Sequence, residues 1–315
     1  MTVAVELDAQ YRQLREECGL LDRSGRGAIA VLGPDGAEYL QGQLTNDVEA
    51  LAVGEGQYAA LLDRKGHMQS DMRVLRLDED EVWIDTEPGA TDAVVRHLAI
   101  YKIGREVEIA QPGDEVAILS LLGPAAGELA GTGPLAPEHA HREARVGGVD
   151  CRAAATDLGI DLICAASRAQ DVAGALIEAG AAPVSEPAAE ILRVESGRPR
   201  FGHEMSAATI PQEAGIDGRA VSFTKGCYIG QETVARLHYK GRPNRRLRGL
   251  KLEAPVAPDD AISREGREIG RIGTAVISPA HGPIALAVIR REAEPGTLVE
   301  VGESGIGAQV VELPF

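Results

Sequence analysis

The sequence predicts an α+β protein made of two similar halves and a small C-terminal β-barrel. Three observations support this fold class. The chain has 315 residues, more than one simple core usually holds. A pair of strands followed by a helix occurs twice, about 80 residues apart. After Arg245 the chain changes to short apolar runs separated by Gly and Pro, a pattern typical of a small barrel or sandwich.

The first half begins with a strand and a helix and continues with a hairpin. Ala28–Leu32 is apolar enough for a strand, and the Gly-Pro-Asp turn after it starts a helix that we expect to run through Leu44. His67–Leu77 and Glu81–Asp85 flank an acidic turn and predict a β-hairpin. A helix is expected next, from about Ala90 to Leu98.

The second half repeats the order of hairpin and helix. Val149–Ala155 and Ile160–Ala165 are the two predicted strands, and Ser167–Ala179 is the helix after them. Residue identity between the two copies is weak, so a chance similarity stays open. Because each copy alone would expose one face of its sheet, we expect the two halves to pack together.

The C-terminal part is predicted to be a separate small domain. Gly241 and Pro243 interrupt the chain, so we place the boundary there, with residues 1–240 as the two-half region and residues 241–315 as the barrel. The predicted strands of the barrel are Leu247–Leu252, Glu268–Ile277, Ile284–Ile289, Thr297–Val301 and Ala308–Leu313.

The charge of the chain limits the classes of partner. With 48 acidic and 32 basic residues, the formal net charge is −16, which argues against general binding to nucleic acids or membrane surfaces. Residues 224–246 reverse this balance, and we call them the basic island. It contains one acid, Glu232, and the basic residues Lys225, Arg236, Lys240, Arg242, Arg245 and Arg246. A nucleic-acid-binding module built on the island is a third functional class, but no aromatic-rich pattern supports it.

The cellular setting that the sequence favours is the cytosol. The N-terminal residues show no signal-peptide pattern, and no apolar run approaches the ~18 residues of a membrane span. The four cysteines form no C-x-x-C pair and suggest neither a metal site nor a disulfide framework. We therefore expect no bound metal and a reducing compartment.

Cys227 is the first candidate for a functional side chain. It lies between Gly226 and Gly230, two residues after Lys225, and a helix is expected to begin near Tyr228 or Ile229. A helix N-terminus and a neighbouring cation would both favour the thiolate form. A small, buried packing residue is the alternative, since this is the commonest role of a free cysteine.

Two acids are candidates for binding or proton transfer. Glu195 continues the apolar side of a helix predicted over Ala188–Ser196, so its carboxylate is expected to face inward and to need a partner. A ligand with adjacent N–H donors would suit it, and an internal salt bridge with Arg198 or Arg200 is the alternative. Asp71 alternates with Ser70 in the predicted strand, and its plain interpretation is an exposed acid.

The octapeptide K-G-C-Y-I-G-Q-E at residues 225–232 resembles the signature of the YgfZ family of folate-binding proteins. Two further segments, Leu21–Val48 and Arg193–Met205, resemble parts of the glycine-cleavage T-protein superfamily to which YgfZ belongs. The resemblance covers nearly the whole chain. It implies two ferredoxin-like halves and a small barrel, with the three domains in a ring around tetrahydrofolate. The basic island is expected to favour a polyglutamylated folate, because it is a cationic patch in a chain of net charge −16.

The resemblance also implies roles for individual residues. Glu195 matches the carboxylate that pairs with the pterin ring, and Cys227 matches the signature cysteine. Gln231 stands where T-proteins usually have an Arg, and Lys225, Gln231 and Arg236 are expected to help hold the folate. T-proteins tend to have paired acids where this chain has Ser70 and Asp71. Only Asp71, the second acid, is kept here, which puts aminomethyl transfer in doubt.

Two functions follow from this resemblance. The first is a cytosolic, tetrahydrofolate-binding, YgfZ-like protein that supports the assembly or repair of iron–sulfur clusters in client enzymes. The second is a folate-dependent transferase that moves an aminomethyl or methyl group from an amine donor, with Asp71 orienting or deprotonating the amine. Cys227 is the predicted catalytic residue of the first function, in which its thiolate, near the bound folate, accepts or releases a group or protects a cluster.

Overall fold

The computed structural model describes residues 3–315, which form two compact units. Unit 1 consists of the residues up to Leu62 together with Gln69–Glu186 and Ser222–Ile229. Unit 2 consists of Asp63–Met68, Pro187–Val221 and Gly230–Phe315. The predicted boundary at residue 240 and the ring of three domains stay predictions.

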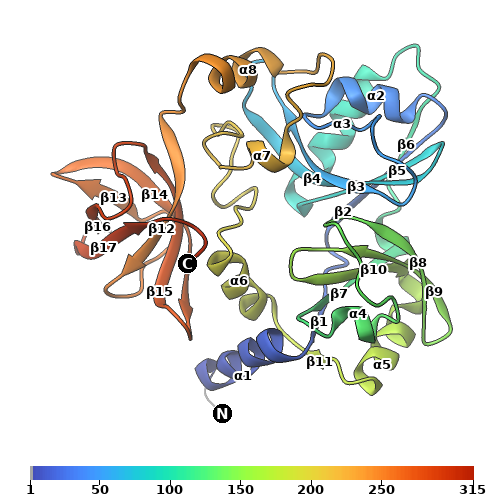
Figure 1. The fold of residues 1–315 in the computed structure, drawn as a ribbon, viewed down its shortest axis with the longest axis horizontal. Coiled ribbons are helices and arrows are strands. Elements are labelled where there is room, and N and C mark those ends of the chain that lie inside the picture. Colours follow the sequence, from blue (N-terminus) through green and yellow to red (C-terminus); the bar gives the residue numbers. More distant parts are fainter. Residues whose placement is uncertain (1–2) are drawn as a thin grey trace. The chain divides into compact units, whose positions relative to one another are not determined.

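The first sheet of unit 1 has five strands in the order β3-β4-β5-β2-β6. Its strands are β2 (Gly27–Leu32), β3 (Gly56–Leu62), β4 (Met68–Asp78), β5 (Glu81–Thr86) and β6 (Glu108–Ala110). Helices α2 (Gly36–Gln43) and α3 (Thr91–Tyr101) cover one face, where Leu40, Val94 and Leu98 are buried against the strands (Figure 1). The predicted hairpin of β4 and β5, followed by a helix, is confirmed.

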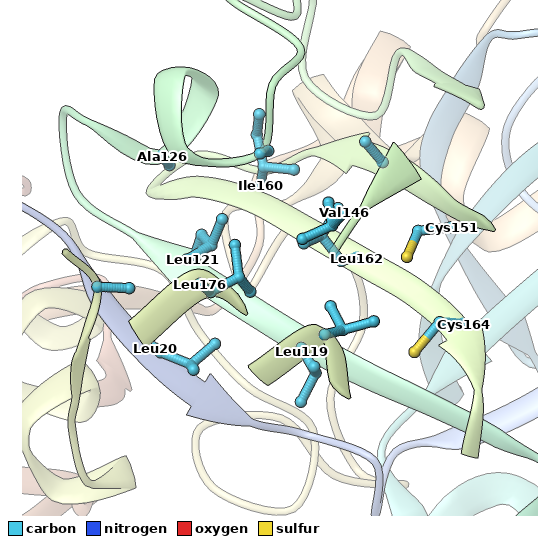
Figure 2. Packing of buried hydrophobic residues seen from close by; sticks show 14 of the residues in the cluster. Leu20, Leu119, Leu121, Ala126, Val146, Cys151, Ile160, Leu162, Cys164 and Leu176 are labelled. Carbon is cyan, nitrogen blue, oxygen red and sulfur yellow. The ribbon is translucent and has the colours of Figure 1, made fainter. Parts of the chain in front are cut away.

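The second sheet of unit 1 has six strands in the order β11-β1-β7-β10-β9-β8. Its strands are β1 (Gly19–Asp22), β7 (Val116–Leu122), β8 (His141–Val146), β9 (Val149–Ala155), β10 (Gly159–Ala165) and β11 (Ala182–Pro183). Helices α4 (Ala126–Leu129) and α5 (Ala169–Glu178) lie on one face. Figure 2 shows Leu176 of α5 over Leu119, Leu121 and Leu162 of the strands. The second hairpin and its helix therefore also form as predicted.

The uncovered faces of these two sheets meet inside unit 1. Apolar side chains from both sheets form one buried cluster, which includes Leu75 and Trp83 of the first sheet and Ala154 of the second. The pairing explains why each half needs the other, since each sheet buries one face under its helices and the other against its neighbour. The N-terminal helix α1 (Val3–Glu16) precedes β1 in the same unit.

Unit 2 contains a closed barrel of six strands in the order β12-β15-β14-β13-β16-β17. They are β12 (Arg245–Leu252), β13 (Ala261–Arg264), β14 (Arg267–Ser278), β15 (Gly282–Arg290), β16 (Leu298–Val301) and β17 (Ile306–Val311). The predicted barrel is confirmed, although sequence patterns missed β13. That strand is short and only Ile262 in it is buried, so it has too few apolar residues for a periodic signal.

The α-helices of unit 2 precede the strands of the barrel in the chain. They are α6 (Glu186–Glu195), which begins at the end of unit 1, α7 (Asp217–Ala220) and α8 (Gln231–Lys240). Short 3₁₀ helices also occur in the chain, at Pro88–Ala90, Gly113–Glu115 and Ala166–Arg168. Among the helices of the described chain, none is long and apolar enough to cross a membrane.

Candidate functional site

Asp71 lies on β4 and is partly buried, so the interpretation of it as an exposed acid is wrong. The Tyr58 hydroxyl donates a hydrogen bond of 2.6 Å to Asp71 Oδ2. Burial raises the pKa of Asp71 to about 6, although the hydrogen bond from Tyr58 acts in the opposite direction. A carboxylate of this kind is largely ionised at neutral pH and remains close to the range in which it can accept and return a proton.

Ser70 cannot replace the acid that is missing beside Asp71. Its side chain is completely buried, and its hydroxyl lies 2.5 Å from the Thr86 hydroxyl. The Ser70 hydroxyl also donates to the Asp71 carbonyl at 2.8 Å. The alternation predicted for this strand is correct on the buried side, where Met68 and Met72 accompany Ser70. Ser70 is thus part of the packing of β4 against β5.

Arg73 stands beside Asp71 and belongs to a buried ionic network between the two sheets of unit 1. Its guanidinium donates to Asp85 at 2.6 Å and to Asp161 at 2.7 Å. Arg26 adds a second contact to Asp85 at 2.8 Å, and these arginines lower the pKa of Asp85. Separate sheets supply the two aspartates, so the network joins the halves, and breaking one partner would leave an uncompensated buried charge.

Lys225 is held by backbone carbonyl groups. Its ammonium group donates to the carbonyls of Gln41 at 2.6 Å, Leu44 at 2.8 Å and Asn46 at 2.8 Å. Burial lowers the pKa of Lys225 to about 8, while Asp47 and Glu49 oppose this shift. An ammonium group has three N–H donors, and all three are used here. The predicted role of Lys225 in holding a ligand therefore has a structural alternative.

Cys227 is exposed and lies in the loop that precedes α8. The prediction that this helix begins near Tyr228 is wrong, because α8 begins at Gln231. Gly230 precedes it with a φ of 84°, a left-handed backbone that favours glycine and breaks the helical run. The helix N-terminus is therefore not next to the thiol. Gly226 has open space around it and shows no close approach that would require a glycine.

The other three cysteines are buried, which separates them from Cys227. Figure 2 shows Cys151 and Cys164 on neighbouring strands in the core of the second sheet. Burial raises the pKa of Cys18 and of Cys151 to about 11, and it also raises the pKa of Cys164. Of the four thiols, Cys227 alone is accessible, so the packing alternative fails for Cys227 and describes the other three.

A chain of hydrogen bonds connects the Cys227 loop with Asp71 inside unit 1. Asn46 accepts from Lys225 through its backbone carbonyl, and its side-chain amide donates to the Tyr58 carbonyl at 2.8 Å. Tyr58 in turn donates to Asp71 through its hydroxyl group. Sequence patterns did not identify Asn46 or Tyr58. Tyr58 lies outside the segments that resemble known proteins, and Asn46 lies in the Leu21–Val48 segment, from which no role for this residue was inferred.

Glu195 is the last residue of α6 in unit 2, and only 4% of its surface is exposed. The Ser278 hydroxyl at the end of β14 donates a hydrogen bond of 2.6 Å to Glu195 Oε1. The backbone carbonyl of Glu195 accepts a hydrogen bond from the Phe315 amide. The prediction of an inward-facing carboxylate is confirmed by this burial. Ser278 is a partner that the sequence did not reveal, because it lies 83 positions away.

Arg193 forms a polar cluster between α6 and the barrel, in addition to the bond between Glu195 and Ser278. It donates to Glu190 at 2.6 Å, to Glu204 at 3.0 Å and to the Thr274 hydroxyl at 2.7 Å. Together with the bond between Glu195 and Ser278, this cluster fastens the last turn of α6 to β14. Two of its four polar residues, Arg193 and Glu204, lie in the Arg193–Met205 segment that resembles the superfamily.

The remaining predicted ligand residues lie on α8. Gln231 is its first residue and is partly buried, whereas Arg236 is exposed. The other basic residues of the island in unit 2 are Lys240, Arg242, Arg245 and Arg246, and all are exposed. Arg245 stands directly opposite Arg290 in the β12–β15 pair, which places like charges side by side. The function of Gln231 and Arg236 stays a prediction.

Within residues 3–315, no group of three or more His, Cys, Asp or Glu side chains is arranged to hold a metal ion. A hollow of about 910 Å³ is lined by residues of β12, β13, β16 and β17 and the turns beside them. None of the predicted site residues lines this hollow. The surroundings of Asp71 and Cys227 in unit 1 and those of Glu195 in unit 2 are therefore the better candidates.

Comparison with known proteins places this chain in one family. Residues 3–225 match the family described as the GCVT N-terminal domain. Residues 245–315 match the family described as the Glycine cleavage T-protein C-terminal barrel domain. The chain belongs to the glycine cleavage T-protein family.

Individual relatives cover almost the entire chain. The aminomethyltransferase of Symbiobacterium thermophilum is 33% identical over 97% of this chain and 88% of that protein. The aminomethyltransferase of Streptomyces coelicolor is 31% identical, with the same coverage of 97% and 88%. The crystal structure of glycine cleavage system aminomethyltransferase T from Bartonella henselae has a TM-score of 0.88 and 24% identity, covers 98% of this chain and 89% of its own, and supports the fold. These names support the wider family, not YgfZ in particular.

Proposed function

We propose that this protein binds tetrahydrofolate through the carboxylate of Glu195. The supporting observation is a buried acid at the end of an apolar helix, oriented by the Ser278 hydroxyl. A pterin ring presents neighbouring amino and N–H groups, which a carboxylate accepts as charge-assisted hydrogen bonds. The residues around Glu195 thus fit the donor set of the cofactor, and bound tetrahydrofolate would supply nitrogen atoms that accept a one-carbon unit.

The comparisons favour one use of the folate, the transfer of a one-carbon unit from an amine. The relatives that cover the chain are named aminomethyltransferases. Asp71 is the residue that we propose to orient or deprotonate the amine, since its pKa of about 6 suits a general base. Tyr58 would fix the position of the carboxylate through its hydroxyl group.

A second candidate function is the YgfZ-like support of iron–sulfur enzymes. Two observations within the chain favour it over transfer. Cys227 is the one accessible thiol of the four, and it stands in the octapeptide that resembles the YgfZ signature. Ser70, buried and bonded to Thr86, leaves Asp71 without the paired acid of the T-proteins. In this function the thiol would act on, or protect, a cluster of a client protein.

One set of measurements tests folate binding and separates the two uses. Calorimetric titration with tetrahydrofolate should show binding, and its absence at millimolar folate would refute the common proposal. Turnover with small amines should be lost in Asp71→Asn and kept in Cys227→Ser if the protein is a transferase. If the protein is YgfZ-like, Cys227→Ser should fail to restore cluster-enzyme activities in a deletion strain, whereas Asp71→Asn should restore them. Loss of that restoration in Asp71→Asn alone would place the transferase first.

A further inference from the structure

We propose that Lys225 is a positioning residue, whose ammonium group fixes the loop of residues 222–229 and thereby holds Cys227 in place. The importance given to Cys227 rests on the proposed function, whereas the position of the loop can be measured without it. Lys225 would then not bind the anionic part of a ligand. The two roles differ in what a substitution of Lys225 should change.

The contacts of Lys225 match the needs of one end of α2. The last carbonyls of a helix have no partner within the helix, and this end of the helix dipole is negative. The carbonyls of Gln41 and Leu44 belong to this end of α2, and that of Asn46 follows shortly after. With distances of 2.6–2.8 Å, the ammonium group satisfies all three of them at once.

The loop has further contacts with the same segment. The Ser222 amide donates to the Thr45 carbonyl at 3.0 Å, and the Ile229 amide donates to the Gly42 carbonyl at 3.3 Å. Tyr228 is 7% exposed, and its ring lies 5.1 Å from the Lys225 ammonium group. Lys225 and Tyr228 are therefore anchored on either side of an exposed thiol, which explains how Cys227 can be accessible and yet fixed.

The bond to Asn46 extends the effect of Lys225 toward Asp71. Asn46 contacts Tyr58 through its side chain, and Tyr58 contacts Asp71, as described above. Lys225 contacts the carbonyls of residues 41, 44 and 46, and Asn46 leads through Tyr58 to Asp71. The loop that carries the thiol and the strand that carries the acid are therefore both connected to residues 41–46.

The test uses Lys225→Met, which keeps the apolar part of the side chain and removes its N–H donors. A nitroxide label on Cys227 should become more mobile by electron paramagnetic resonance. Hydrogen exchange at the Ile229 and Ser222 amides should accelerate by about tenfold or more, with strand β7 unchanged. Lys240→Met is the matched control, because it removes an exposed charge of the basic island and should change neither measurement.

Lys225→Gln provides a second variant if the methionine variant does not fold. Its amide has two donors, so the label should show a mobility between those of the wild type and Lys225→Met. An equally immobile label and unchanged exchange in the folded variants would overturn the proposal. So would a lower folate affinity without any loosening of the loop, which would make Lys225 a ligand residue. Failure of folate binding in the wild type would refute only the proposed function.

Discussion

Replacement of Glu195 by Gln tests the folate site with the least change in shape. Glutamine keeps one carbonyl oxygen, so the Ser278 hydroxyl still has an acceptor. It loses the negative charge, and its NH₂ group would oppose a donor of the pterin ring. The loss of a charge-assisted pair is worth about 1.5–3 kcal/mol. Tetrahydrofolate affinity should fall by about 10- to 150-fold.

The fold should lose much less than the ligand in this variant. Glu195 is 4% exposed, so removal of its charge also removes the cost of keeping a charged group away from water. We expect a change in the free energy of unfolding of about 1 kcal/mol or less. Isothermal calorimetry and urea denaturation give the two values on the same samples. Ser278→Ala is the control, since it leaves the charge and removes only the orienting hydroxyl. An unchanged folate affinity in Glu195→Gln would refute the assignment.

Three further outcomes are expected. Cys227 should react with iodoacetamide at least about tenfold faster than the three buried thiols. Mass spectrometry of the alkylated protein measures the four rates, and equal rates would contradict the accessibility of Cys227. The raised pKa of Asp71, about 6, means that the folded protein binds its proton more tightly than the unfolded chain, so this group loses stabilising effect as the pH rises from about 4 to 6. Asp71→Asn should therefore gain in urea midpoint relative to the wild type between pH 4 and 7, and a relative loss would show the opposite sign of the shift. Gly230→Ala should cost about 1–2 kcal/mol of stability because its φ is 84°, whereas Gly226→Ala should be nearly neutral, which thermal denaturation of the pair can decide.

Much of the fold could be predicted because local patterns agree with it. The strands of both hairpins alternate or are apolar throughout, and each is followed by a helix with a periodic apolar side, so β4, β5, β9 and β10 were found nearly to the residue. The strands of the barrel were found in the same way, apart from β13. The edges of the sheets were harder, since short strands such as β6 and β11 pair through backbone groups that no side-chain pattern reveals.

The candidate site could be predicted only in part. The inward direction of the Glu195 side chain follows from the period of the helix. Glu195 stands four positions after Ile191 and three after Leu192, so it shares their buried face. The helix at Cys227 was placed too early, since the residues before Gln231 have no strong preference against a helix and the left-handed turn at Gly230 decides its start. Lys225 was expected beside the thiol as a free charge, but its side chain reaches carbonyls that are 179 to 184 positions away in the chain.

The sequence by itself determined the class of fold, the acidic character of the chain, the basic island and the residues that resemble the T-protein superfamily. These properties depend on composition, periodicity and short motifs, which are local in the chain. The tertiary structure alone decided which polar groups meet: Ser278 with Glu195, Tyr58 with Asp71, and Lys225 with the end of α2. It also decided which of the four thiols is exposed. Hydrogen bonds and burial depend on distances between segments far apart in sequence, and those distances exist only once the chain has folded.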